Sequence, residues 1–106
     1  VLKLSELPNL VEVIITNNTN DTITTGLHYR IEHYEKNEWN EVSPEQPFHD
    51  LGWTLIPSGF HPFETKLLPD KINYKTGKYR IVKYYLKSDY QNTKKDFNVY
   101  AEFNIE

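Results

Sequence analysis

A chain of 106 residues, 38% of them hydrophobic, is long enough to form one domain with its own core and too apolar to be disordered. Its aromatic content of 14%, set against the single alanine Ala101, favours strands over helices, and the absence of cysteine excludes disulfides and thiolate-bound zinc. The formal net charge is -3, and the basic residues are scattered among the acidic ones, so nucleic acid is not an expected partner.

The first nine residues differ in character from the rest of the chain. They combine charged side chains and Pro8 with isolated leucines. This mixture is typical of a lead-in or linker that packs only in part. We therefore predict a lead-in over residues 1–9 and a domain over residues 10–106.

The first predicted strand covers residues 11–15, where apolar side chains at odd positions alternate with the residues between them. The polar run 17–21 then predicts a turn. That run also contains Asn-x-Thr patterns at Asn17 and Asn20, which we interpret as chance matches and not as glycosylation sites.

A β-hairpin is predicted next. After a short segment around Ile23, residues 27–34 alternate, and Glu35–Asn37 separates them from a second run at 39–42. The stretch Pro44–Pro47 then interrupts strand pairing, because proline has no amide donor.

A tight turn is predicted between two further strands. Residues 51–56 form the first of these strands, with Trp53 and Leu55 on one face, and residues 60–67 form the second. In Pro57-Ser58-Gly59, proline presets the dihedral angle at the start of the turn, and we expect Gly59 to take the positive φ after it.

The last part of the chain contains the clearest strand pattern. The run Arg80–Leu86 reads as buried on both faces, and from Phe97 to Ile105 every odd residue is predicted to point to the core. We count about seven strands with turn signals between them. The predicted fold class is an all-β, immunoglobulin-like Greek-key β-sandwich of two antiparallel sheets, with a small barrel as the alternative.

Gly77-Lys78-Tyr79, placed after a crossing loop and at the start of a core strand, is typical of a tyrosine corner, in which the Tyr79 hydroxyl bonds to upstream backbone. Gly59, Gly77 and Tyr79 are therefore predicted to be structural residues. The wider motif set is Ile15–Thr19, Lys36–Trp39, Trp53–Gly59, Thr76–Lys83 and Tyr100–Ile105.

Together these segments resemble a bacterial immunoglobulin-like domain family, found mostly in exported proteins and lipoproteins of Gram-positive bacteria and largely without assigned function. The resemblance runs from about Leu10 to Ile105. It implies a fold and no catalytic residues. Ser58 departs from the expected pattern, where a second turn residue is more usual, and so does the long loop Ser88–Asp96.

No pattern predicts chemistry, and we expect neither enzymatic activity nor a cofactor. None of the serines lies in a Gly-x-Ser-x-Gly elbow. His28 and His33 are an odd number of residues apart and so point to opposite faces of a regular strand, while His49, His61 and Asp50 lie near separate turns. No metal site is predicted.

The aromatic residues exceed what one small core needs, and their ordinary interpretation is that tyrosines cover sheet faces. The alternative is a partner surface. Its predicted members, which flank two turns, are Phe48, Trp53, Phe60 and His61.

The leading hypothesis is a non-catalytic accessory, spacer or interaction module of an exported bacterial protein, which binds a protein or a cell-wall component and has neighbouring domains in a larger chain. As the resemblance implies, it would lie outside the cell or on the envelope, with any signal or anchor upstream. No apolar run here approaches the roughly 20 residues of a membrane span. Two alternatives are a small β-sandwich protease inhibitor and a carbohydrate-binding module that uses Trp39 or Trp53.

Overall fold

The alternating apolar runs do form strands in the computed structural model, which describes residues 1–48 and 51–106. Seven strands and very little helix occur in this part of the chain, as predicted. In chain order the elements are η1 (Leu4–Glu6), β1 (Leu10–Thr16), β2 (Ile23–Glu35), β3 (Glu38–Glu41), β4 (Gly52–Leu55), β5 (Phe60–Lys66), β6 (Gly77–Lys87), α1 (Tyr90–Thr93) and β7 (Asp96–Ile105).

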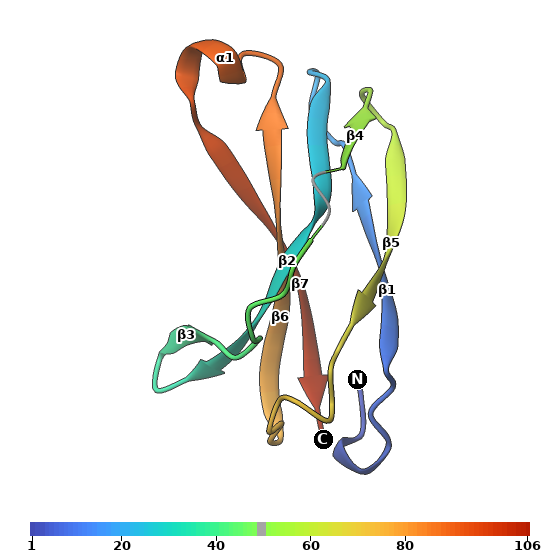
Figure 1. Ribbon diagram of the computed structural model, residues 1–106, viewed down its shortest axis with the longest axis vertical. Helices are drawn as coiled ribbons and strands as arrows, with labels where there is room; N and C mark the ends of the chain where they lie inside the picture. Colours follow the sequence, from blue (N-terminus) through green and yellow to red (C-terminus); the bar gives the residue numbers. More distant parts are fainter. Residues whose placement is uncertain (49–50) are drawn as a thin grey trace.

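The strands form two antiparallel sheets that pack face to face (Figure 1). The large sheet has the order β3-β2-β6-β7, with β4 also paired to β2, and the small sheet consists of β1 and β5. Because β5 crosses back to pair with β1 before the chain returns to the large sheet at β6, sequence neighbours lie in different layers. The predicted two-sheet sandwich is confirmed.

Strand β2 is the longest strand, and a bulge divides its pairing with β6 between Thr25 and Tyr29. Its first part pairs with β4 and its last part with β3. The predicted hairpin to β3 is present, and its two turn residues, Lys36 and Asn37, have φ values of 54° and 66°. Two positive φ angles in a two-residue loop match the twist of the paired strands.

The core is closed at one end by tyrosine hydroxyl groups that bind backbone. Tyr79 is 1% exposed; its hydroxyl donates to the carbonyl of Lys75 at 3.0 Å and accepts the Lys75 N–H at 2.9 Å, so the tyrosine corner is present. The Tyr74 hydroxyl donates to the Leu67 carbonyl at 2.6 Å, and burial raises the pKa of Tyr74 above its usual value. The connection from β5 to β6 is thus fixed from both of its ends.

Gly77 opens β6 with a φ of 142°, in a region that L-amino acids rarely adopt. A Cβ atom there would lie 3.0 Å from Nε2 of His33. We expect Gly77→Ala to lower the free energy of unfolding by about 1 kcal/mol, measured by denaturant titration. The control is Gly52→Ala, because a Cβ at Gly52 meets only ordinary contacts, the Thr24 methyl at 3.4 Å and the Thr25 carbonyl oxygen at 3.8 Å. Equal losses in the two variants would contradict the backbone argument.

The turn between β4 and β5 differs from the prediction in one detail. Ser58 takes the positive φ, at 68°, and Gly59 does not. The Gly59 N–H donates to the Ile56 carbonyl at 2.8 Å, which makes Ser58 the third residue of the turn, where this angle is required. Glycine is required at position 59 for a steric reason instead, because a Cβ atom there would lie 2.9 Å from the Ile56 carbonyl oxygen.

Asn17 is buried, although it lies in the predicted polar turn. It is 1% exposed, and its side-chain amide donates to the carbonyls of Asp21 at 2.7 Å and Leu55 at 2.9 Å. It therefore holds the turn after β1 against β4. A glycan could not be attached to this nitrogen in the folded domain, in agreement with the chance interpretation of the motif.

Lys83 lies between the two sheets with 3% exposure, within the run Arg80–Leu86 that was predicted to be buried on both faces. Its Nζ donates to the Gly26 carbonyl at 2.7 Å and lies 4.0 Å from the centre of the Phe63 ring. Gly26 belongs to the bulged part of β2, where the ladder leaves carbonyl groups free to accept from a side chain. Burial lowers the pKa of Lys83 to about 8.

The predicted lead-in is attached to the last strand. Leu2 forms a parallel bridge with Ile105, and Leu2 and Leu7 pack against the core. As a result, both chain ends lie at the same end of a molecule that measures 44 × 26 × 26 Å (Figure 1).

Candidate functional site

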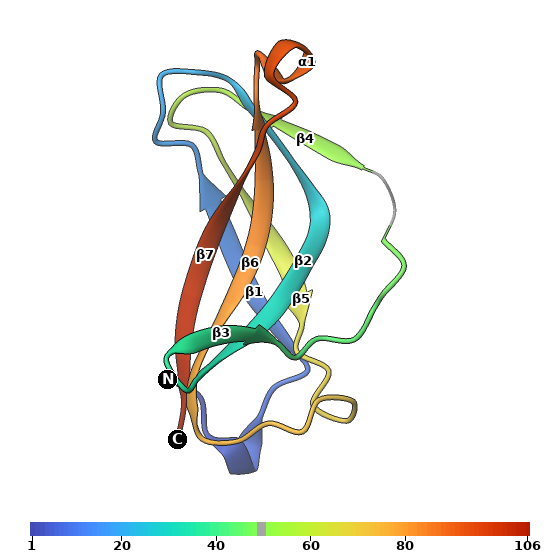
Figure 2. The ribbon, with the colours of Figure 1, turned by 90° about the vertical axis from the view of Figure 1, so that its left-hand side faces the viewer.

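The outer face of the large sheet carries a cluster of aromatic and charged side chains, and Figure 2 looks onto this face. Odd residues of β6, such as Tyr79 and Ile81, point to the core, so Arg80 and Val82 lie on the outer face, where Val82 is only 1% exposed. We call the cluster the Arg80 face and define it by Arg30, Glu32, Tyr34, Trp39, Lys78, Arg80, Tyr100 and Glu102.

Arg80 is held between two aromatic rings at the centre of this face. Its guanidinium carbon lies 4.2 Å from the centre of the Trp39 ring and 4.1 Å from that of Tyr100. Trp39 comes from β3 and Tyr100 from β7, the two ends of the strand order, so the arginine links all four strands. Cation–π contacts of this kind contribute about 0.5 to 2 kcal/mol each.

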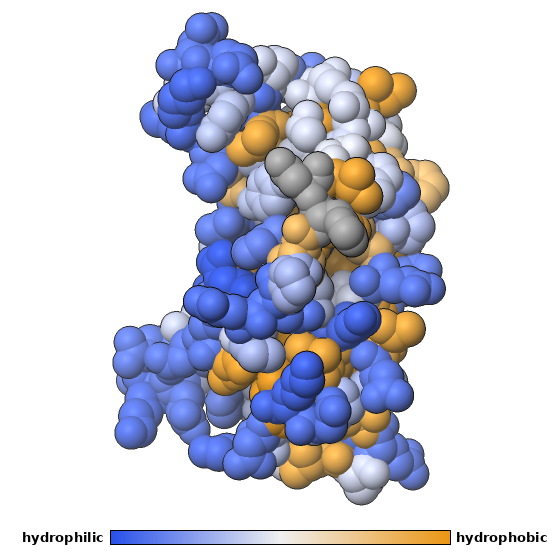
Figure 3. Space-filling view, in the orientation of Figure 1, coloured by the Kyte–Doolittle hydropathy of each residue, from blue (hydrophilic) through white to orange (hydrophobic). Residues whose placement is uncertain are grey.

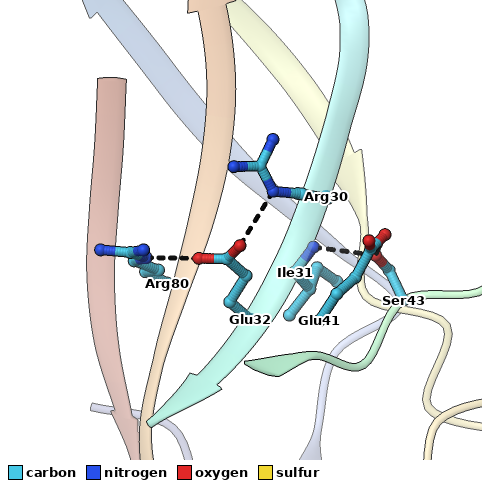
Figure 4. A network of polar contacts seen from close by, with 6 residues as sticks. All are labelled: Arg30, Ile31, Glu32, Glu41, Ser43 and Arg80. Carbon is cyan, nitrogen blue, oxygen red and sulfur yellow. Dashed lines mark hydrogen bonds and ion pairs between the residues drawn. The ribbon is translucent and has the colours of Figure 1, made fainter. Parts of the chain in front are cut away.

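Glu32 forms ion pairs with both arginines of the cluster (Figure 4). One carboxylate oxygen accepts from Nε of Arg80 at 2.6 Å and the other from Nε of Arg30 at 2.9 Å. Burial opposes ionisation of this carboxyl, but the two charged hydrogen bonds outweigh burial and lower the pKa of Glu32 below its usual value. The network therefore stays ionised at neutral pH.

A second hydrogen-bond group fixes the base of β3, the strand that carries Trp39 (Figure 4). The Ile31 N–H donates to the Ser43 hydroxyl at 3.0 Å, and that hydroxyl donates to the carboxylate of Glu41 at 3.1 Å. The Val42 N–H also donates to the Ile31 carbonyl at 2.9 Å. The hydrogen bonds of the Ser43 hydroxyl therefore join β2 to the end of β3, which is a structural role and not that of a nucleophile.

Replacing Arg80 with lysine tests the stack. Lysine keeps the charge but has no planar group to lie between two rings, so we expect Arg80→Lys to lower the free energy of unfolding by about 1 kcal/mol. The matched control is Arg30→Lys. The Arg30 side chain is 31% exposed, and its contact with Glu32 is an ion pair that a lysine can also form. Similar losses for both variants, measured by urea titration, would contradict a special role for the stack.

The predicted partner surface does not form one patch. Trp53 and His61 do meet, with ring centres 5.0 Å apart, and both pack against Phe63 at the inner face. Phe60 is 65% exposed on the outer face of the small sheet, because adjacent strand residues point to opposite sides. Phe48 lies in the other core cluster, 5.3 Å from Tyr29. A partner role for this set stays a prediction.

The described histidines and the two tryptophans pack against other aromatic side chains. In residues 1–48 and 51–106, no group of three or more histidine, aspartate or glutamate side chains could hold a metal ion. His33 is buried against the Tyr79 ring at 4.3 Å, and His49 and Asp50 lie outside the described residues. Trp39 and Trp53 are both partly buried, and a carbohydrate-binding role for either stays a prediction.

Hydrophobic surface is unevenly distributed on the side of the molecule that carries the connection from β3 to β4 (Figure 3). Hydrophilic residues cover the α1 end and the β2–β3 hairpin, and hydrophobic residues gather between the two sheets lower down. On the outer face of the small sheet, Ile14 is 54% exposed beside the exposed Pro62.

The Arg80 face was not predicted from the sequence. The signal that could have indicated it was the pair Arg30 and Glu32, which point outward from the same strand.

Comparison with known proteins agrees with this architecture. A family model described as a bacterial Ig-like domain matches residues 3–104. No curated protein and no solved structure matches the chain. Among the helices of the described part of the chain, none is long and apolar enough to span a membrane.

Proposed function

Because the chain belongs to the bacterial Ig-like domain family, we propose that it is a non-catalytic module of an exported bacterial protein that binds another protein through the Arg80 face. The observation that carries the proposal is the Arg80 guanidinium held between Trp39 and Tyr100 on an open sheet face. Tryptophan, tyrosine and arginine are the residue types that dominate protein interfaces. Tyr100 is 48% exposed and would supply contact area at little entropic cost.

The charge of the Arg80 face favours a mixed polar partner. Its positive members are Arg30, Lys78 and Arg80, and Glu32, Glu102 and the adjacent Glu41 oppose them. A balanced face of this kind does not attract a polyanion such as nucleic acid. It is suited to a protein surface with charged groups of both signs and apolar area between them.

The protease-inhibitor alternative stays a prediction, tested by the rate at which a substrate is cleaved in the presence of the domain.

Site-specific photocross-linking in the intact protein on the producing cells tests the proposal. We expect Tyr100→p-benzoylphenylalanine to give one discrete cross-linked product, because the probe would lie inside the interface. The matched control places the same probe at Glu64, on the outer face of the small sheet, and should give none. No product from Tyr100, or equal products from both positions, would contradict the proposal.

A further inference from the structure

Arg80 lies in a row of charged side chains that crosses the outer face of the large sheet. Strand pairing places Glu32 opposite Arg80 on one side and Glu102 opposite it on the other. Glu41 continues the row on the far side of Glu32, away from Arg80. The Glu102 carboxylate lies 3.3 Å from Nζ of Lys78. Among the described residues, Glu32 is therefore the one acidic side chain that is paired with Arg80.

Most of the hydrogen-bonding capacity of Arg80 is unused within the domain. A guanidinium carries five N–H groups, and in Arg80 the one at Nε donates to Glu32 at 2.6 Å. The remaining N–H groups, on the two terminal nitrogens, have no acceptor in the part of the chain that the structure describes. They are not buried, because every buried side-chain nitrogen and oxygen of that part has a hydrogen-bond partner. The guanidinium extends away from Glu32 and offers these groups to the surroundings (Figure 4).

The same guanidinium is held in position before any partner arrives. Its carbon atom lies 4.2 Å from the centre of the Trp39 ring and 4.1 Å from that of Tyr100, and Glu32 fixes its Nε. The Arg80 side chain is only 19% exposed. Much of the rotamer entropy that an arginine loses on binding is therefore already lost here. The flanking rings also exclude water, which strengthens a charged hydrogen bond made at this place.

The charges around Arg80 leave one positive charge unmatched. Glu32 shares its single carboxylate between Arg80 and Arg30, so two guanidinium charges and one carboxylate charge give these three side chains a net charge of +1. Lys78 and Glu102 pair with each other and add no net charge. A second carboxylate at the terminal nitrogens of Arg80 would balance the group.

We propose that the terminal nitrogens of Arg80 bind an aspartate or glutamate side chain of the partner protein in a bidentate pair. This inference rests on the proposed function, because it names the group on the partner that the Arg80 face recognises. The two oxygens of a carboxylate match the two terminal nitrogens of a guanidinium and accept two parallel hydrogen bonds. The partner residues beside the acidic group are apolar, because the exposed rings of Tyr34 and Tyr100 offer apolar surface on the same face.

Two short peptides test the site by NMR. The probe is acetyl-Leu-Glu-Leu-amide, and the matched control is acetyl-Leu-Gln-Leu-amide, which has nearly the same shape without the charge. We expect the glutamate peptide to bind about tenfold more tightly than the glutamine peptide. At saturation it should also slow the exchange of the terminal Arg80 N–H protons with water by about tenfold, because these groups become hydrogen-bonded. Equal affinity for the two peptides, or no binding of the glutamate peptide at tens of millimolar, would overturn the proposal.

Substitutions locate the carboxylate at Arg80. Arg80→Gln removes the guanidinium and should abolish the preference for the glutamate peptide. Lys95→Gln makes the same change in net charge at an exposed position after α1 and should leave the preference unchanged. If Arg80→Gln fails to fold in a thermal unfolding control, Arg80→Lys replaces it, because lysine keeps the charge but cannot form the bidentate pair. The full preference in a folded variant at position 80 would overturn the proposal.

This result is separable from the test of the proposed function. If Tyr100→p-benzoylphenylalanine gives its cross-linked product but the two peptides bind equally, the Arg80 face binds a protein through other contacts, and only the carboxylate inference is overturned. If the glutamate peptide is preferred and the preference depends on Arg80, but no cross-linked product forms, the carboxylate site is supported and the proposed function is contradicted.

Discussion

We expect Tyr79→Phe to lower the free energy of unfolding by about 2 to 3 kcal/mol, although it removes only one oxygen atom. The Tyr79 hydroxyl both donates to and accepts from the backbone of Lys75, in a site where the tyrosine is 1% exposed. Without it, a carbonyl and an N–H of the crossing loop lose their partner in a place that water reaches poorly. Such unpaired groups cost more than a hydrogen bond contributes on average.

Urea unfolding followed by tryptophan fluorescence measures this loss. The matched control is Tyr34→Phe, because Tyr34 is 40% exposed and its hydroxyl can stay in water. We expect the control to change the free energy of unfolding by less than about 0.5 kcal/mol. A Tyr79→Phe variant as stable as Tyr34→Phe would show that the tyrosine corner is not a main support of the crossover.

The stability of the domain should rise with pH in the mildly alkaline range because of Lys83. Its pKa is about 8 in the folded state against 10.5 for an exposed lysine, because burial disfavours the charged amine. Between these two values the unfolded chain binds more protons than the folded one, so raising the pH favours folding. From about pH 7 to about pH 9.5 we expect a gain of about 2 kcal/mol.

Lys83→Met is the variant that isolates this effect. Methionine keeps the length and the apolar stem but has no proton to lose, so the gain in stability between about pH 7 and about pH 9.5 should disappear. Lys78→Met, at a side chain that is 52% exposed, is the control and should keep the gain. Above about pH 10 the raised pKa of Tyr74 acts in the opposite direction, so the comparison stops below that value. If the free energy of unfolding of Lys83→Met changed with pH as in the wild type, the account of Lys83 as a buried amine with a lowered pKa would be wrong.

The fold could be predicted because strand alternation and turn chemistry are local. Phe103 and Ile105 face inward from β7, as the period of two predicted. The pattern of Gly77 and Tyr79 predicted the position of the crossover. The hairpin followed from the polar break Glu35–Asn37 between alternating runs, and the structure narrows its turn to Lys36 and Asn37. In each case, a few neighbouring residues determine the conformation.

The partners of Arg80 and of Lys83 could not be predicted, because both depend on register between distant strands. Arg80 meets Glu32 only because β2 and β6 pair at that level, and no local pattern specifies it. Lys83 lies in the run Arg80–Leu86, which reads as buried on both faces, but the sequence does not reveal its partner, the Gly26 carbonyl in the bulged part of β2. The same limit applies to Phe48, which lies near Trp53 in the sequence but packs in the other core cluster.

Hydroxyl-radical footprinting of the domain in its parent protein, on the producing cells and after purification, tests the central claim that the Arg80 face is the binding surface. We predict that Tyr34 and Tyr100 are oxidised more slowly on the cells than in the purified protein, while Phe60 and Ile56, which are 65% and 66% exposed on other surfaces, react at the same rate in both. Equal oxidation of Tyr34 and Tyr100 in the two states, or protection confined to Phe60 and Ile56, would contradict it.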